Sequence, residues 1–308
     1  MENYPRTQMR FEKMFEKEEA CRLYLERLRW PDGFICPRCG GRDGWRTSRG
    51  LWLCRACRKQ VSVTAGTVLE RSRLSLRVWF RAMWPVTSQK NGASALTVQR
   101  LLGMGSYQTA WAWLHKLRRA MVRPGRDLLS GAVEVDETYV GGERPGKRGR
   151  GAEGKTLVVL AVQILSDGNI GRVRMCPVAD ASGESLLRAV NAMVAPGCEV
   201  RTDGWKGYGE LDSKGYRHRA LRDSAGIGED LLPGCHRVAG LLKRWLLGTH
   251  QGAVRQEHLS YYLDEFTFRF NRRTSASRGL LFYRLAQQAV QVGPAPYDTL
   301  IKQPVVGG

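Results

Sequence analysis

The first 125 residues carry apolar side chains at helical spacing. Between Phe11 and Arg29 these side chains stand among charged ones, as in an amphipathic helix. A second helix is predicted from Ser75 to Thr87. Two further helices, Ser94 to Leu102 and Ser106 to Met121, are separated by the turn Gly103-Met104-Gly105, and Ser106 is a suitable N-cap.

The last two of these helices have the layout of a helix-turn-helix. In such a motif the second helix enters the major groove of DNA, and its first residues here include Gln108 and Thr109. The same pattern also suits an ordinary helical hairpin that packs Trp111, Trp113 and Leu117 inward. The pattern alone leaves both interpretations open.

Beyond Pro124 and Gly125 the pattern changes from helical to strand-like. A helix is predicted from Ser182 to Val194. Runs rich in apolar and β-branched residues predict four strands, which are Ala132–Val140, Thr156–Leu165, Gly171–Val178 and Cys198–Thr202. Three strands followed by a helix and another strand predict an α/β fold, with a mixed sheet and helices on its faces.

Four cysteines form two C-x-x-C pairs, with fourteen residues between the pairs. They are Cys36, Cys39, Cys54 and Cys57. Each pair can give two thiolates to one tetrahedral metal ion, and this spacing is typical of a zinc ribbon built on a small hairpin. The alternative is a thioredoxin-like redox pair, which needs only one C-x-x-C and does not explain the second.

The charge of the chain indicates a polyanionic partner. The formal net charge is +20 over 308 residues, which favours nucleic acid over an acidic membrane surface. No apolar run approaches the roughly 20 residues of a membrane-spanning helix, and Met1 to Arg10 lacks the apolar core of a signal peptide. We therefore expect a cytoplasmic, nucleoid-associated protein. In that compartment the other four cysteines would be reduced.

Two acidic residues lie where a sheet could bring them together. Asp136 is inside the first predicted strand among valines, and Asp203 directly follows the fourth strand. A carboxylate in an apolar strand is costly unless it has a partner, which is either a divalent cation or a salt-bridging side chain. The second aspartate and the basic composition favour the cation.

Several segments together resemble the bacterial insertion-sequence transposases that join an N-terminal zinc ribbon to a DDE-type catalytic domain. These segments are Val133–Gly142, Thr202–Trp205, Leu242–Arg244 with Gly248–His250, Tyr262–Phe266 and Phe270–Arg273. The resemblance implies a ribonuclease-H-like fold, two magnesium ions, and cutting and joining of the element's DNA ends. Asp136 and Asp203 would then be metal ligands, and the ions would clamp the scissile phosphate.

The third metal ligand departs from the usual pattern of the family. In much of the family it is Glu or Asn, seven residues before a lysine on the same helix. Counting back from Lys243 gives His236, which would share a helical face with Lys243. A histidine ligand suits Mn²⁺ better than Mg²⁺. Alternatively, His236 only starts the helix and Glu229 or Asp230 supplies an oxygen.

Basic residues near these acids are candidate DNA contacts. Lys243 and Arg244 would hold phosphate oxygens, and a late helix would extend the basic track. The insert at 141–154 is either a solvated loop or a phosphate clamp. Besides the first two, the candidates are Arg144, Lys147, Arg148, Arg150, Arg269, Arg272 and Arg273. The late charge run also suits a solvated face.

We therefore expect four segments and a DNA transposase. The segments are an N-terminal helix with the zinc ribbon (1–70), a helix-turn-helix-like part (71–125), a ribonuclease-H-like catalytic domain (126–285) and a tail (286–308). The partners would be the element's ends and target DNA, with several copies of the chain acting together. Alternatives are a DNA-binding regulator or domesticated transposase without catalysis, and a structure-selective nuclease of the same fold.

Overall fold

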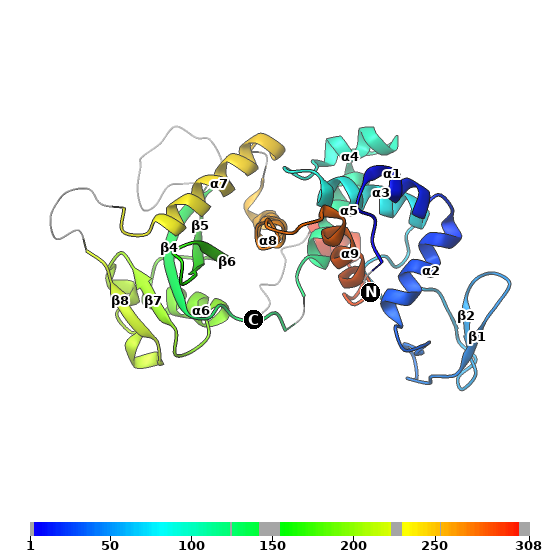
Figure 1. Ribbon diagram of the computed structural model, residues 1–308, viewed down its shortest axis with the longest axis horizontal. Coiled ribbons are helices and arrows are strands. Elements are labelled where there is room, and N and C mark those ends of the chain that lie inside the picture. Colours follow the sequence, from blue (N-terminus) through cyan, green and yellow to red (C-terminus); the bar gives the residue numbers. More distant parts are fainter. Residues whose placement is uncertain (1–2, 124, 142–154, 223–229, 253, 302–308) are drawn as a thin grey trace. The chain divides into compact units, whose positions relative to one another are not determined.

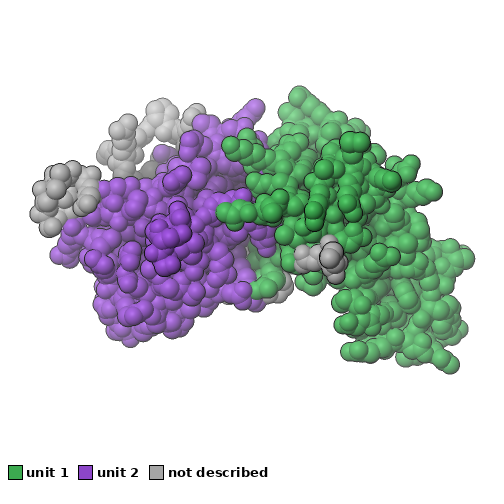
Figure 2. All heavy atoms as spheres, in the orientation of Figure 1, with its two compact units in different colours: residues 1–124, 274–302 green, residues 125–273, 303–308 purple. Residues whose placement is uncertain are grey.

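A computed structural model describes residues 3–123, 125–141, 155–222, 230–252 and 254–301. The chain forms two compact units (Figure 2). The first combines residues 1–124 with 274–302, and the second comprises residues 125–273 together with 303–308. In the described residues no helix is both long and apolar enough to cross a membrane.

The first unit begins with two helices and a small antiparallel sheet (Figure 1). The single helix expected from Phe11 to Arg29 is in fact two, α1 (Gln8–Met14) and α2 (Glu18–Arg29). The helix breaks where Phe15 packs against other aromatic rings, including Tyr24 and Phe80. The three short strands β1 (Gly44–Arg46), β2 (Trp52–Cys54) and β3 (Gln60–Val61) form the antiparallel sheet of the ribbon.

The remaining helices of the first unit begin close to the expected residues. Ser75 caps α3 (Leu76–Ser88) and Ser94 caps α4 (Ala95–Leu102), which ends at Gly103 in the left-handed conformation. Ser106 precedes α5 (Tyr107–Ala120), but its hydroxyl donates to Gln108 Oε1 instead of capping the helix. Along α5, Trp113 and Leu117 are buried while Gln108 and Thr109 are exposed.

A segment from the end of the chain completes the core of the first unit. Helix α9 (Arg278–Ala289) places Phe282 among aromatic rings from α1, α2 and α3, and α10 (Tyr297–Ile301) follows it. Residues 274–285, which we expected in the catalytic domain, thus belong to the first compact unit, because α9 packs its buried face against α3.

The second unit is built on a five-stranded mixed sheet. Its strands are β4 (Ala132–Val140), β5 (Thr156–Ile164), β6 (Ile170–Val178), β7 (Glu199–Thr202) and β8 (Arg217–Ala220). Their order is β6-β5-β4-β7-β8; the first three are antiparallel, and β4, β7 and β8 run parallel. The expected mixed sheet is confirmed. The fifth strand was not predicted, because β8 is an edge strand of mostly exposed polar residues.

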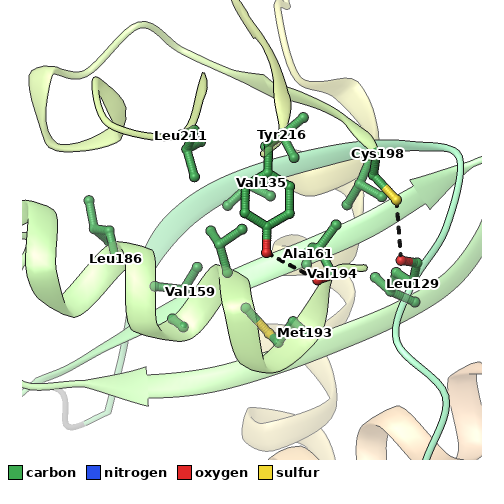
Figure 3. Packing of buried hydrophobic residues seen from close by; sticks show 14 of the residues in the cluster. Leu129, Val135, Val159, Ala161, Leu186, Met193, Val194, Cys198, Leu211 and Tyr216 are labelled. Atoms are coloured by element: carbon green, nitrogen blue, oxygen red, sulfur yellow. Dashed lines mark hydrogen bonds between the residues drawn. The ribbon is translucent and has the colours of Figure 1, made fainter. Parts of the chain in front are cut away.

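Helices cover both faces of this sheet. On one face α6 (Gly183–Met193) packs Leu186 and Val190 against Val133 and Val135 of β4. Figure 3 shows this core, in which the Tyr216 hydroxyl donates to the carbonyl oxygen of Val194. The other face is covered by α7 (Pro233–His250) and α8 (Leu259–Phe270), and it carries the alternate residues of β4.

Candidate functional site

The four predicted zinc ligands converge. The sulfur atoms of Cys36, Cys39, Cys54 and Cys57 all lie within 4.8 Å of one another. The Cys36 and Cys57 sulfurs are 3.7 Å apart, and those of Cys39 and Cys54 are 3.6 Å apart. A set of four thiolates at tetrahedral spacing fits a structural zinc ion, so both C-x-x-C pairs serve one cluster.

The two C-x-x-C turns have the same backbone construction. The N–H of Gly40 donates to the carbonyl of Cys36, and the N–H of Arg58 donates to the carbonyl of Cys54. Both donor residues have positive φ angles, +72° for Gly40 and +56° for Arg58. This conformation closes each turn so that the two thiols point to the same side.

Asp136 lies in the middle of β4, on the face of the sheet that α7 covers. Its side chain is 18% exposed. Burial raises the pKa of this carboxyl group and the charge of Asp203 raises it further, while the Glu137 backbone N–H, His236 and Lys243 lower it. A buried carboxylate beside a second one is stabilised by a cation.

Asp203 directly follows the last residue of the neighbouring strand β7. The parallel register pairs Glu134 of β4 with Arg201 of β7. Asp136 and Asp203 each come two residues after this pair, the last of the register, and the charge of Asp203 acts on the Asp136 carboxyl group. Asp203 is exposed, and its Oδ1 atom accepts a hydrogen bond of 3.0 Å from the N–H of Trp205.

His236 and Lys243 extend from α7 toward these aspartates. The Nε2 atom of His236 is 3.5 Å from Oδ2 of Asp136, and its Nδ1 atom is 2.6 Å from Oδ1 of Asp230. Partial burial and the charge of Lys155 lower the pKa of Lys243, and Asp136 acts in the opposite direction. Glu229, the other alternative ligand, lies outside the described residues. The structure thus brings Asp136, Asp203, His236 and Lys243 together.

Glu134 also belongs to the candidate site, and the sequence analysis did not identify it. This buried carboxylate on β4 accepts a hydrogen bond of 3.0 Å from the N–H of Cys235 at the start of α7. Burial raises its pKa, while the N–H groups of Cys235 and Gly234 lower it. A glutamate flanked by Val133 and Val135 on a strand is the signal that could have identified it.

The candidate DNA contacts differ in how they are placed. Arg244 is exposed on α7, and Arg273 is exposed at the end of α8 while donating to the carbonyls of Gly171 and Phe270. The guanidinium of Arg272 lies over the ring of Phe268. Arg144, Lys147, Arg148 and Arg150 lie outside the described residues.

Arg269 does not fit the expected basic track. Its side chain is only 9% exposed and lies 3.8 Å from Oε1 of Glu265, one turn earlier on α8. Because this buried arginine is paired with a buried glutamate of its own helix, we leave it out of the DNA surface.

Comparison with known proteins supports the same interpretation of both units. The ISXO2-like transposase domain matches residues 128–271, and the transposase zinc-ribbon domain matches residues 16–60. A protein of Halobacterium salinarum, described as an uncharacterized protein in transposable element ISH50, is 31% identical over 281 residues. The match covers 83% of this chain and 92% of that relative.

A zinc ribbon followed by a five-stranded ribonuclease-H-like unit defines an insertion-sequence transposase of the DDE type. The chain belongs to the ISXO2-like transposase family. Membership implies phosphoryl-transfer chemistry and DNA binding. We expected a bacterial protein. Because the relative is archaeal, the comparison does not establish that the chain is bacterial.

Proposed function

We propose that this chain is a catalytically active transposase that binds the ends of its element, cleaves DNA strands there and joins them to target DNA. The supporting observation is the geometry of Asp136, Asp203 and His236. Asp136 and Asp203 come from adjacent parallel strands, the charge of Asp203 acts on Asp136, and the imidazole of His236 approaches Asp136 from α7.

These three side chains fit a hard divalent cation. They offer carboxylate oxygens and one imidazole nitrogen, a donor set that suits Mn²⁺ and also accepts Mg²⁺. A pair of bound ions would activate a water or a 3′-hydroxyl group and stabilise the departing oxygen of the phosphodiester. The raised pKa of Asp136 supports a cation here, because a positive charge offsets the burial of that carboxylate.

The protein's own side chains would position the DNA. Lys243 lies on the face of α7 that carries His236, two turns further along, and would hold a phosphate oxygen near the aspartates. Arg244 and Arg273 would extend this contact along the backbone. In the first unit, Gln108 and Thr109 at the start of α5 would face a major groove, as in a helix-turn-helix.

The zinc ribbon would supply a further phosphate-binding surface. Its exposed side chains are strongly basic, and a surface of this kind neutralises phosphates without base specificity. The exposed arginines of the ribbon are Arg38, Arg42, Arg46, Arg49, Arg55 and Arg58. We also propose that several copies act together, because two element ends and a target must be handled in one event.

A strand-joining assay tests this function. Purified protein is incubated with a labelled duplex that ends in the element's terminal sequence, a supercoiled target plasmid and Mn²⁺. A transposase transfers the label to the plasmid. Cleavage without transfer would instead identify a nuclease, and binding without either reaction would identify a non-catalytic regulator.

A further inference from the structure

His236 lies between two carboxylates that approach its two ring nitrogens. Asp230 Oδ1 is 2.6 Å from Nδ1, and Asp136 Oδ2 is 3.5 Å from Nε2. The two ring nitrogens point in different directions, so the imidazole ring lies between Asp230 and Asp136. Of these two residues, only Asp136 is one of the two aspartates on the sheet strands.

The unequal distances indicate which nitrogen carries the proton in a neutral ring. An ionised carboxylate only accepts hydrogen bonds, so the short 2.6 Å contact requires the proton on Nδ1. The Nε2 lone pair then faces Asp136 Oδ2. A divalent ion beside these two acceptor atoms, which lie 3.5 Å apart, would satisfy both.

We propose that Asp230 is a positioning residue for His236: its carboxylate accepts the Nδ1–H, sets the rotation of the ring and directs Nε2 toward Asp136. The role of Nε2 as a metal ligand rests on the proposed function, whereas the hydrogen bond itself does not. Asp230 can serve in this way because it lies just before α7, six residues ahead of His236. Of the three residues considered from the sequence for the third ligand position, His236, Glu229 and Asp230, this assignment gives His236 and Asp230 separate tasks.

The first test is the tautomer of His236 in the metal-free protein. The chain has five histidines, so ¹⁵N-histidine labelling gives few signals, and His236→Gln identifies the relevant ring. Spectra are recorded near pH ~9, where a free imidazole is neutral. We expect the Nδ1–H form in the original protein and in Asp230→Asn, whose amide oxygen still accepts. We expect a shift toward the Nε2–H form in Asp230→Ala.

The second test is Mn²⁺ affinity, measured by electron paramagnetic resonance of free Mn²⁺. Loss of the outer partner of a metal-bound histidine commonly weakens binding by about 10- to 100-fold. Asp230→Ala should show a loss of that size, while Asp230→Asn should retain most of the affinity. The matched control is Glu210→Ala, which removes an exposed acid of the same unit and should leave both readouts unchanged.

The results separate the possible outcomes. An unchanged tautomer in Asp230→Ala overturns the proposal. Equal losses of Mn²⁺ affinity in Asp230→Asn and Asp230→Ala also overturn it, because Asp230 would then be a direct ligand. If the original protein binds no Mn²⁺, the proposed metal site fails, and the tautomer shift alone decides whether Asp230 positions His236.

Discussion

The backbone of Gly234 passes so close to Glu134 that a β-carbon at this position would lie 2.8 Å from Oε2 of the carboxylate. The same carbon would lie 2.9 Å from the side chain of Ile164. Glu134 cannot move aside without losing its hydrogen bond from the Cys235 N–H. The first turn of α7 is therefore fixed on β4, two residues from Asp136, and His236 takes its position from this contact.

We predict that Gly234→Ala destabilises the protein by about 1–3 kcal/mol, the usual cost of overpacking a well-packed site, and lowers cleavage activity. The matched control is Gly240→Ala in the same helix, where no atom lies near the added carbon. Since alanine favours a helix interior by about 0.5–1 kcal/mol over glycine, this control should be neutral or stabilising. Urea unfolding measures both variants. Equal effects of the two changes would contradict the role given to Gly234.

The stability of the second unit should depend on the protonation of Asp264 on α8. Burial raises the pKa of Asp264 to about 7, although Arg126, 3.8 Å away, acts to lower it. Because the folded state holds the proton more tightly than the unfolded chain, this residue's contribution to stability is lost as the pH rises from about 4 to about 7.

Asp264→Asn removes this titration and should therefore increase stability more at pH ~8 than at pH ~5, relative to the original protein. Urea unfolding at the two pH values, followed by circular dichroism, provides the comparison. An equal stability difference at both pH values would show that Asp264 is not protonated in the folded state near neutral pH.

The zinc ribbon leads to a prediction about metal content. Purified protein should contain one zinc ion per chain, and Cys36→Ser or Cys57→Ser should lose it and weaken DNA binding while the sheet of the second unit stays folded. Cys176→Ala is the control, because this half-buried thiol lies in β6, outside the cluster. Elemental analysis decides the question, and full zinc content in either serine variant would refute the four-cysteine site.

The net charge of +20 predicts a strong dependence of DNA affinity on salt. For a protein that neutralises six to ten phosphates, affinity falls by about 10³- to 10⁵-fold between ~50 and ~200 mM salt. Titrations of a duplex at several salt concentrations give the slope. A flat response would show that phosphate contacts do not dominate binding.

Some of this architecture was readable from the sequence because the signals are local. The cysteine spacing and the alternation along β4 each depend on a few neighbouring residues. Asp136 and Asp203 could be predicted to lie near each other, because one is in the first predicted strand and the other directly follows the fourth. His236, by contrast, was found only by counting back from Lys243 in the resemblance to known transposases.

Other features depend on long-range packing that no local pattern contains. The polar edge strand β8 forms only because β7 offers it hydrogen-bonding partners. The periodicity of α9 predicts an amphipathic helix with a buried face. It does not predict that Phe282 on this face completes the core of the first unit. Arg269 and Arg273 look alike in sequence, but Arg269 is buried beside Glu265 whereas Arg273 is exposed.

The most direct test of the proposed metal site separates DNA binding from cleavage. Asp136→Ala and Asp203→Ala should each reduce cleavage of the element's ends by more than about 100-fold, because a direct ligand contributes more than the outer partners whose loss costs 10- to 100-fold. His236→Ala should also cripple cleavage, whereas His236→Glu or His236→Asn should retain part of it by restoring an oxygen donor.

The measurement is cleavage of a labelled element-end duplex with Mn²⁺, made in parallel with a binding titration on the same duplex in the absence of metal. We predict that the two aspartate variants bind within a few-fold of the original protein, since the basic surface is intact, and do not cleave. Normal cleavage by either aspartate variant would contradict the assignment of this site.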